Sequence, residues 1–183
     1  IQLYINGKPK LSLENFTFGN IASSISSYSL LNVACQNIEI KGLNLSPNSF
    51  IPRSQLPLIN LLTAMLAIMN TNISLNYHPT PFNLFTIQGI IYSKSDLTSV
   101  VFDSVNIINQ GAGFNPNLYQ ISFSARNPSL SILNSTISST SFSINGDNST
   151  EITFKNVLLQ RQAFAIQTPS VNLTADDLFM INS

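Results

Sequence analysis

An eight-residue pattern recurs along this chain and constrains its fold more than any other feature. In residues 11–18 (LSLENFTF), two short runs of alternating apolar and polar residues flank a polar pair. Each run is typical of a short strand with one buried face, and the polar pair is typical of a bend between two strands. Clear copies occupy residues 38–45, 100–107 and 152–159, and weaker copies begin at Ile73, Leu130 and Val171. The sequence therefore predicts an array of repeats.

Two all-β folds fit this pattern: a solenoid of parallel coils, and an antiparallel sandwich in which each copy is a hairpin. A type I′ turn, a common two-residue hairpin turn, needs a left-handed backbone at both residues. The first bend residue in the clear copies is Glu14, Lys41, Asp103 or Lys155. Only the second is suited to a left-handed backbone: Asn15, Gly42 or Asn156, with Ser104 a poorer fit. One left-handed residue makes a bend rather than a reversal, which favours the parallel solenoid.

With Asn at its bend, the repeated pattern resembles the coils of right-handed parallel β-helix proteins, the pectin-lyase-like superfamily. The resemblance extends from Leu11 to Leu178, apart from residues 58–69, and implies three parallel sheets, with stacked asparagines in the two-residue bend. Right-handed crossover is also the rule for parallel strands. We therefore expect residues 1–183 to form a single all-β domain, a right-handed parallel β-helix (β-solenoid). Because the chain begins at Ile1 and ends within a repeat, we expect a segment of a longer chain or of a filament.

Two segments interrupt the expected array. Residues 58–69 are rich in Leu, Ala and Met, which are strong helix formers, so we expect one short inserted helix there. A bilayer-spanning helix needs about 20 residues, so this segment is too short to be a transmembrane helix. Near the N-terminus, Asn6-Gly7 is a hairpin signal and predicts a pair of strands over residues 1–9.

The composition excludes several classes of function. Only 9% of the residues are charged, and the formal net charge is zero. A nucleic-acid partner is therefore not expected, because phosphate backbones attract basic surfaces. Cys35 is the only cysteine, which rules out a disulfide within the chain. A surface of Asn, Ser and Thr in place of charges is typical of a secreted or cell-surface protein, so we expect an extracellular location.

The sequence offers little support for catalysis. Enzymes of the pectin-lyase-like superfamily include hydrolases, and glycoside hydrolysis needs a pair of carboxylates. The only adjacent acidic pair, Asp176-Asp177, resembles the paired aspartates of polygalacturonases, but the other motifs of those enzymes are absent. The only histidine is His78. We therefore expect no enzyme, no metal site and no cofactor, and we interpret Asp176-Asp177 as a bend.

N-linked glycans are the one modification that the sequence suggests. Acceptor triplets occur at six positions: Asn15, Asn44, Asn72, Asn134, Asn148 and Asn172. The chain is so rich in Asn, Ser and Thr that chance alone gives about as many triplets. The scarcity of surface charge is what favours real glycans at these sites.

The function predicted from the sequence is an extracellular structural or adhesive surface glycoprotein. We expect its coil ends to associate with other copies or with adjoining chain, because uncapped coils expose strand edges and apolar side chains. The alternative is a carbohydrate-active β-helix enzyme or an inactive relative that binds carbohydrate. Ice binding is a third class, but it needs ranks of Thr that recur from coil to coil, and the sequence shows no such rank.

Overall fold

Every regular element in the described part of this protein is a β-strand. The computed structural model describes residues 3–18, 29, 31–45, 57–75, 82–89, 97–109 and 119–181. The strands are β1 (Leu3–Glu14), β2 (Thr17–Phe18), β3 (Leu31–Lys41), β4 (Asn44–Leu45), β5 (Ile59–Thr63), β6 (Met65–Leu75), β7 (Phe82–Gly89), β8 (Leu97–Asn109), β9 (Tyr119–Ala125), β10 (Asn127–Ser138), β11 (Thr140–Gly146), β12 (Ser149–Gln160), β13 (Ala163–Gln167) and β14 (Ser170–Ile181). All pairings between them are parallel.

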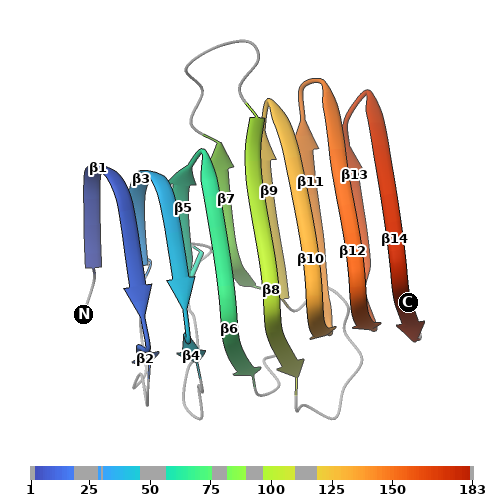
Figure 1. Ribbon diagram of the computed structural model, residues 1–183, viewed down its shortest axis with the longest axis horizontal. Coiled ribbons are helices and arrows are strands. Elements are labelled where there is room, and N and C mark those ends of the chain that lie inside the picture. Colours follow the sequence, from blue (N-terminus) through green and yellow to red (C-terminus); the bar gives the residue numbers. More distant parts are fainter. Residues whose placement is uncertain are drawn as a thin grey trace.

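The strands wind into the coils of a parallel β-helix with three outer faces. Face A consists of the first halves of β1 and β3 with β5, β7, β9, β11 and β13, which form the rear layer in Figure 1. Face B consists of the second halves of β1 and β3 and the first halves of β6, β8, β10, β12 and β14. Face C consists of β2, β4 and the segments that follow the bend in the long strands. The eleven strands of the main path curl 298° round one axis. The parallel β-helix predicted from the sequence is therefore confirmed.

The core lies inside the coils and consists of stacked rows of apolar side chains. In β3 buried and less buried residues alternate, as expected for strands with one face inward. One row on face B contains Ile40, Ile68 and Phe102 in register, and all three are fully buried. Phe102 also meets Phe85 of face A edge to face, with ring centroids 6.2 Å apart. Such contacts join rows of different faces, and the buried residues form one core cluster.

The helix expected over residues 58–69 is absent, and this prediction is wrong. The segment forms β5 and the beginning of β6, joined by a corner at Ala64. The Ala64 N–H donates to the Gln36 carbonyl at 3.0 Å, and the buried Thr63 hydroxyl lies 3.0 Å from the same oxygen. Pairing with the neighbouring coil therefore overrides the helix propensity of the segment.

Of the three weaker repeats, the one that begins at Leu130 is in register as predicted, and the other two are not. In register with Leu11, Ile38 and Val100 lie Leu66 and Leu173, not Ile73 and Val171. Ile73 lies after the bend of its coil and pairs with Leu45 on face C. At the N-terminus no hairpin forms, because β1 runs continuously past Gly7, where the register shifts by a bulge and φ is 75°. Gly7 therefore adopts the left-handed backbone of a β-bulge and not that of a hairpin turn.

Candidate functional site: the outer faces

The bend between faces B and C contains one residue with positive φ in every coil. These residues, with φ between 48° and 65°, are Asn15, Gly42, Asn70, Ser104, Asn134, Asn156 and Asp177. The neighbouring strand registers place them at equivalent positions. Sequence reasoning assigned Asn15, Gly42, Ser104 and Asn156 to bends. It missed Asn70, which directly follows the segment read as a helix, and Asn134, which was assigned only as a glycosylation acceptor.

Side chains at this bend form hydrogen bonds from coil to coil. Asn156 Nδ2 donates to Asn134 Oδ1 at 3.2 Å, and Asn134 Nδ2 donates to Asp103 Oδ1 at 3.0 Å. The Ser104 hydroxyl also donates to Asp103 Oδ1, at 3.1 Å. The donors therefore point in one direction and end on a carboxylate, which has only acceptors to offer. These hydrogen bonds hold neighbouring bends together. They give the amide side chains at the bends a structural role.

The residues considered for catalysis are not gathered into a site. Asp176 and Asp177 are exposed, and Asp177 adopts the bend conformation with φ of 51°. Asp176 lies in register with Lys155 of the preceding coil. His78 lies outside the described residues, and Cys35 is buried in the core. Among the described residues, no group of three His, Cys, Asp or Glu side chains could hold a metal ion.

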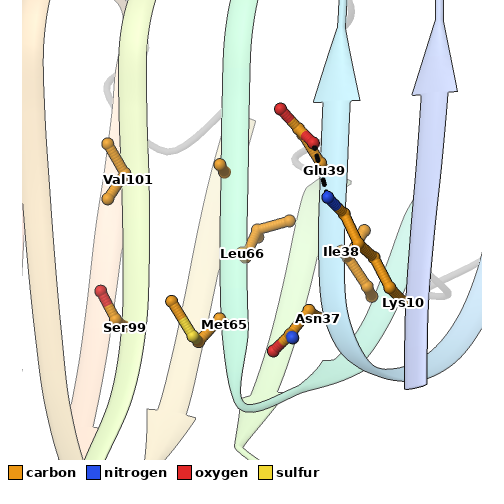
Figure 2. A pocket seen from close by; sticks show the side chains of 9 residues that line it. Lys10, Asn37, Ile38, Glu39, Met65, Leu66, Ser99 and Val101 are labelled. Atoms are coloured by element: carbon orange, nitrogen blue, oxygen red, sulfur yellow. Dashed lines mark ion pairs between the residues drawn. The ribbon is translucent and has the colours of Figure 1, made fainter.

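Face B carries most of the charged strand residues and a shallow hollow. The hollow has a volume of about 260 Å³ and spans β1, β3, β6 and β8 (Figure 2). Its lining comprises Lys10, Asn37, Ile38, Glu39, Met65, Leu66, Ala67, Ser99 and Val101. At one side Lys10 points toward Glu39, and Nζ lies 3.6 Å from Oε2. The hollow forms because the small Ala67 side chain lies between longer neighbours such as Met65.

The single carboxylate in this hollow is held by two lysines. Glu39 Oε1 lies 2.6 Å from Lys41 Nζ, in addition to the Lys10 contact. The hydrogen bond from Lys41 lowers the pKa of the Glu39 carboxyl, and Glu39 raises the pKa of Lys41. Glu39 is thus kept ionised, whereas a general acid needs a raised pKa. The lining also lacks the second carboxylate that glycoside hydrolysis requires.

Face A differs from face B because its described part carries no charged residue from β3 to β13; in the first coil, Lys8 lies in register with Cys35. One of its outward rows contains Asn32, Asn60, Thr86, Ser122, Ser143 and Ala165. The next row along the strands contains Ala34, Leu62, Gln88, Ser124, Asn145 and Gln167. The outward charged residues of face B are Lys10, Glu14, Glu39, Lys41, Asp103, Glu151, Lys155 and Asp176. Sequence reasoning did not single out face A, although residues 119–145 alternate with the period of two that marks its outward positions.

The six glycosylation acceptors are all exposed, and none lies on face A. Asn15 and Asn134 lie in the bend, Asn44 and Asn72 are register partners on face C, and Asn172 lies on face B. Asn148 lies at the corner between β11 and β12, where Nδ2 donates to Asn127 Oδ1 at 3.0 Å. Five of the six acceptors therefore lie away from face A, and Asn148 lies at its border.

Comparison with protein-family models, with curated proteins and with solved structures finds no match to this chain. The function must therefore be argued from the geometry alone. In the part of the chain that the structure describes, no helix has the length and apolar character needed to cross a membrane.

Proposed function

We propose that this protein is an extracellular structural or adhesive surface protein, a glycosylated β-solenoid whose coil ends pack against further coils. For residues 1–183, the covering coils belong to a second copy. The observation that carries the proposal is the exposure of inward-facing side chains in the last described coil.

In this coil, the side chains that continue the inward rows of the core have no further coil packed against them. Leu173 is 63% exposed, whereas its register partner Ile152 in the preceding coil is 2% exposed. Met180 is 53% exposed, whereas its partner Leu159 is fully buried. Burial stabilises by about 25 cal/mol per Å² of apolar surface. A further coil on β14 would gain this energy and would also satisfy the open strand edge.

The low charge and the exposed acceptors support the extracellular part of the proposal. Glycans at exposed Asn residues would supply the solubility that surface charge supplies in most soluble proteins. We assign no catalytic role to the hollow on face B, because Glu39 is its only carboxylate and is paired with lysines.

The proposal is tested by the association state and mass of native material. We expect light scattering at low concentration to detect species larger than one copy, and we expect the intact mass to exceed 20.0 kDa until glycans are removed. Leu173→Lys should abolish association by placing a charge in the contact. Thr174→Lys, which changes the adjacent outward side chain, should leave association intact. A compact, unmodified monomer at every concentration would refute the proposal.

A further inference from the structure

From β3 to β13, face A combines two absences, and face C shares only the first of them. The described residues of this part of face A include no charged side chain, and none of the six glycosylation acceptors lies on it. It does contain outward asparagines, such as Asn32, Asn60 and Asn145, but none of them starts an acceptor triplet. Charges and glycans would both keep a partner away, so face A is open to close approach.

The outward side chains of face A form a regular array of groups that both donate and accept hydrogen bonds. Strands in a sheet lie about 4.8 Å apart, and alternate residues along a strand are roughly 6.7 Å apart. Amides and hydroxyls occupy most positions of the two rows, and each such group can donate and accept. Contacts between coils hold part of the array in place. Asn60 Nδ2 donates to Asn32 Oδ1 at 3.2 Å, and Asn145 Nδ2 donates to Ser124 Oγ at 3.4 Å.

The chemistry of this array restricts the partner. An anionic polymer such as nucleic acid or an acidic polysaccharide would need cations, and the described residues of face A from β3 to β13 offer none. A protein partner is usually anchored by aromatic or Arg side chains, and the described outward side chains of the same strands include neither. The one large apolar side chain exposed in its two rows is Leu62, at 37%. What remains is a partner that is uncharged, periodic and rich in hydroxyl groups.

We propose that face A is the adhesive surface of this protein and binds a neutral polysaccharide. Each contact is weak, because a hydrogen bond made in exchange for water contributes little. The repeat of the coils, however, presents the same kind of contact many times to a polymer that is itself periodic, and linked contacts raise the overall affinity. This inference rests on the proposed function only in that it names the partner of the adhesive role.

The test is a sedimentation assay with insoluble polysaccharides. The probes are cellulose and a β-1,3-glucan as neutral polymers and calcium alginate as an acidic one. We expect the chain to bind at least one neutral polymer, to be indifferent to an increase in salt, and not to bind alginate. The double variant Ser122→Lys/Ser143→Lys changes register partners on face A, and it should bind at least tenfold more weakly. The matched control Ser131→Lys/Thr153→Lys changes register partners on face B, and it should bind like the unchanged chain.

Several results would overturn this inference. The first is no binding to either neutral polymer, and the second is binding to alginate alone. The third is an equal loss of polysaccharide binding in both double variants, provided that circular dichroism shows both to be folded. A face-to-face dimer that Ser122→Lys/Ser143→Lys dissociates would show that face A binds a second copy instead. Light scattering on the same samples reports the proposed stacking of coil ends separately. Loss of that stacking with polysaccharide binding retained would contradict the proposed assembly and leave this inference standing.

Discussion

Replacing Ile68 with Lys is expected to unfold the chain. Ile68 is fully buried in β6, in register between Ile40 and Phe102. An ammonium group at this position would have only apolar side chains beside it in its row, and burying an unpaired charge is among the few single changes that cost more than about 4 kcal/mol. That loss is comparable with the whole stability of a typical domain, about 5–15 kcal/mol. Urea denaturation followed by circular dichroism measures it.

Met65→Lys in the same strand provides the matched control. Met65 points outward beside the hollow of face B and is 57% exposed, so we expect a change within about 0.5 kcal/mol. The pair separates the two interpretations of residues 58–69. In a helix, positions three apart share a face, and both substitutions would then have similar effects. Equal destabilisation by the two variants would contradict the strand assignment.

Gly42→Val is expected to destabilise the protein by about 2–5 kcal/mol. Gly42 has a φ of 65°, and a left-handed backbone costs a residue with a Cβ about 1–2 kcal/mol. A Cβ at this position would also lie 2.6 Å from Asn15 Oδ1, and such overpacking typically costs a further 1–3 kcal/mol or so. The measurement is again the free energy of unfolding in urea.

Gly42→Asn separates the two contributions. Asn meets the same Asn15 side chain but tolerates a left-handed backbone, as the other bend asparagines do. We therefore expect a smaller loss for Asn than for Val, by about 1 kcal/mol. If the two variants were equally stable, backbone conformation would not be what selects glycine at this bend.

The bend is the part of the fold that could be predicted from sequence most fully. Asn and Gly at the second bend position predict a single left-handed residue. A single such residue redirects the strand without reversing it, which is enough to favour parallel coils. Residue spacing alone was insufficient, because Leu13 and Phe16 would share a face in a hairpin as well.

The third coil could not be recognised because its outward positions are also apolar. Leu62 and Met65 point outward, 37% and 57% exposed, and they erase the alternation that marks a strand with one buried face. With that signal lost, the helix propensity of Leu, Ala and Met decided the prediction. Only pairing with the neighbouring coils, visible in the structure, reveals the strand.

Face A was missed for a different reason. Its rows can be recognised only when the register between coils is known. The sequence does not reveal that register, because the loops between coils vary in length. Ser122 and Ser143 are direct neighbours, although 21 residues separate them, whereas Thr86 and Ser122, also neighbours, are 36 residues apart. A search for recurring Thr at one spacing therefore finds no rank, while the structure aligns Asn, Thr and Ser in one row.

The register of the parallel coils is tested most directly by engineered disulfides. In a Cys35→Ala background, Ser131→Cys/Thr153→Cys changes register partners of β10 and β12. Their Cα atoms should be about 4.8 Å apart, within the range that a disulfide spans. In the control pair, Ser131→Cys/Lys155→Cys, the offset of two residues places the Cα atoms roughly 8 Å apart, which is too far. The parallel β-helix predicts rapid oxidation of the first pair alone. Failure of the first pair to form a disulfide, or equal oxidation of both pairs, would contradict it.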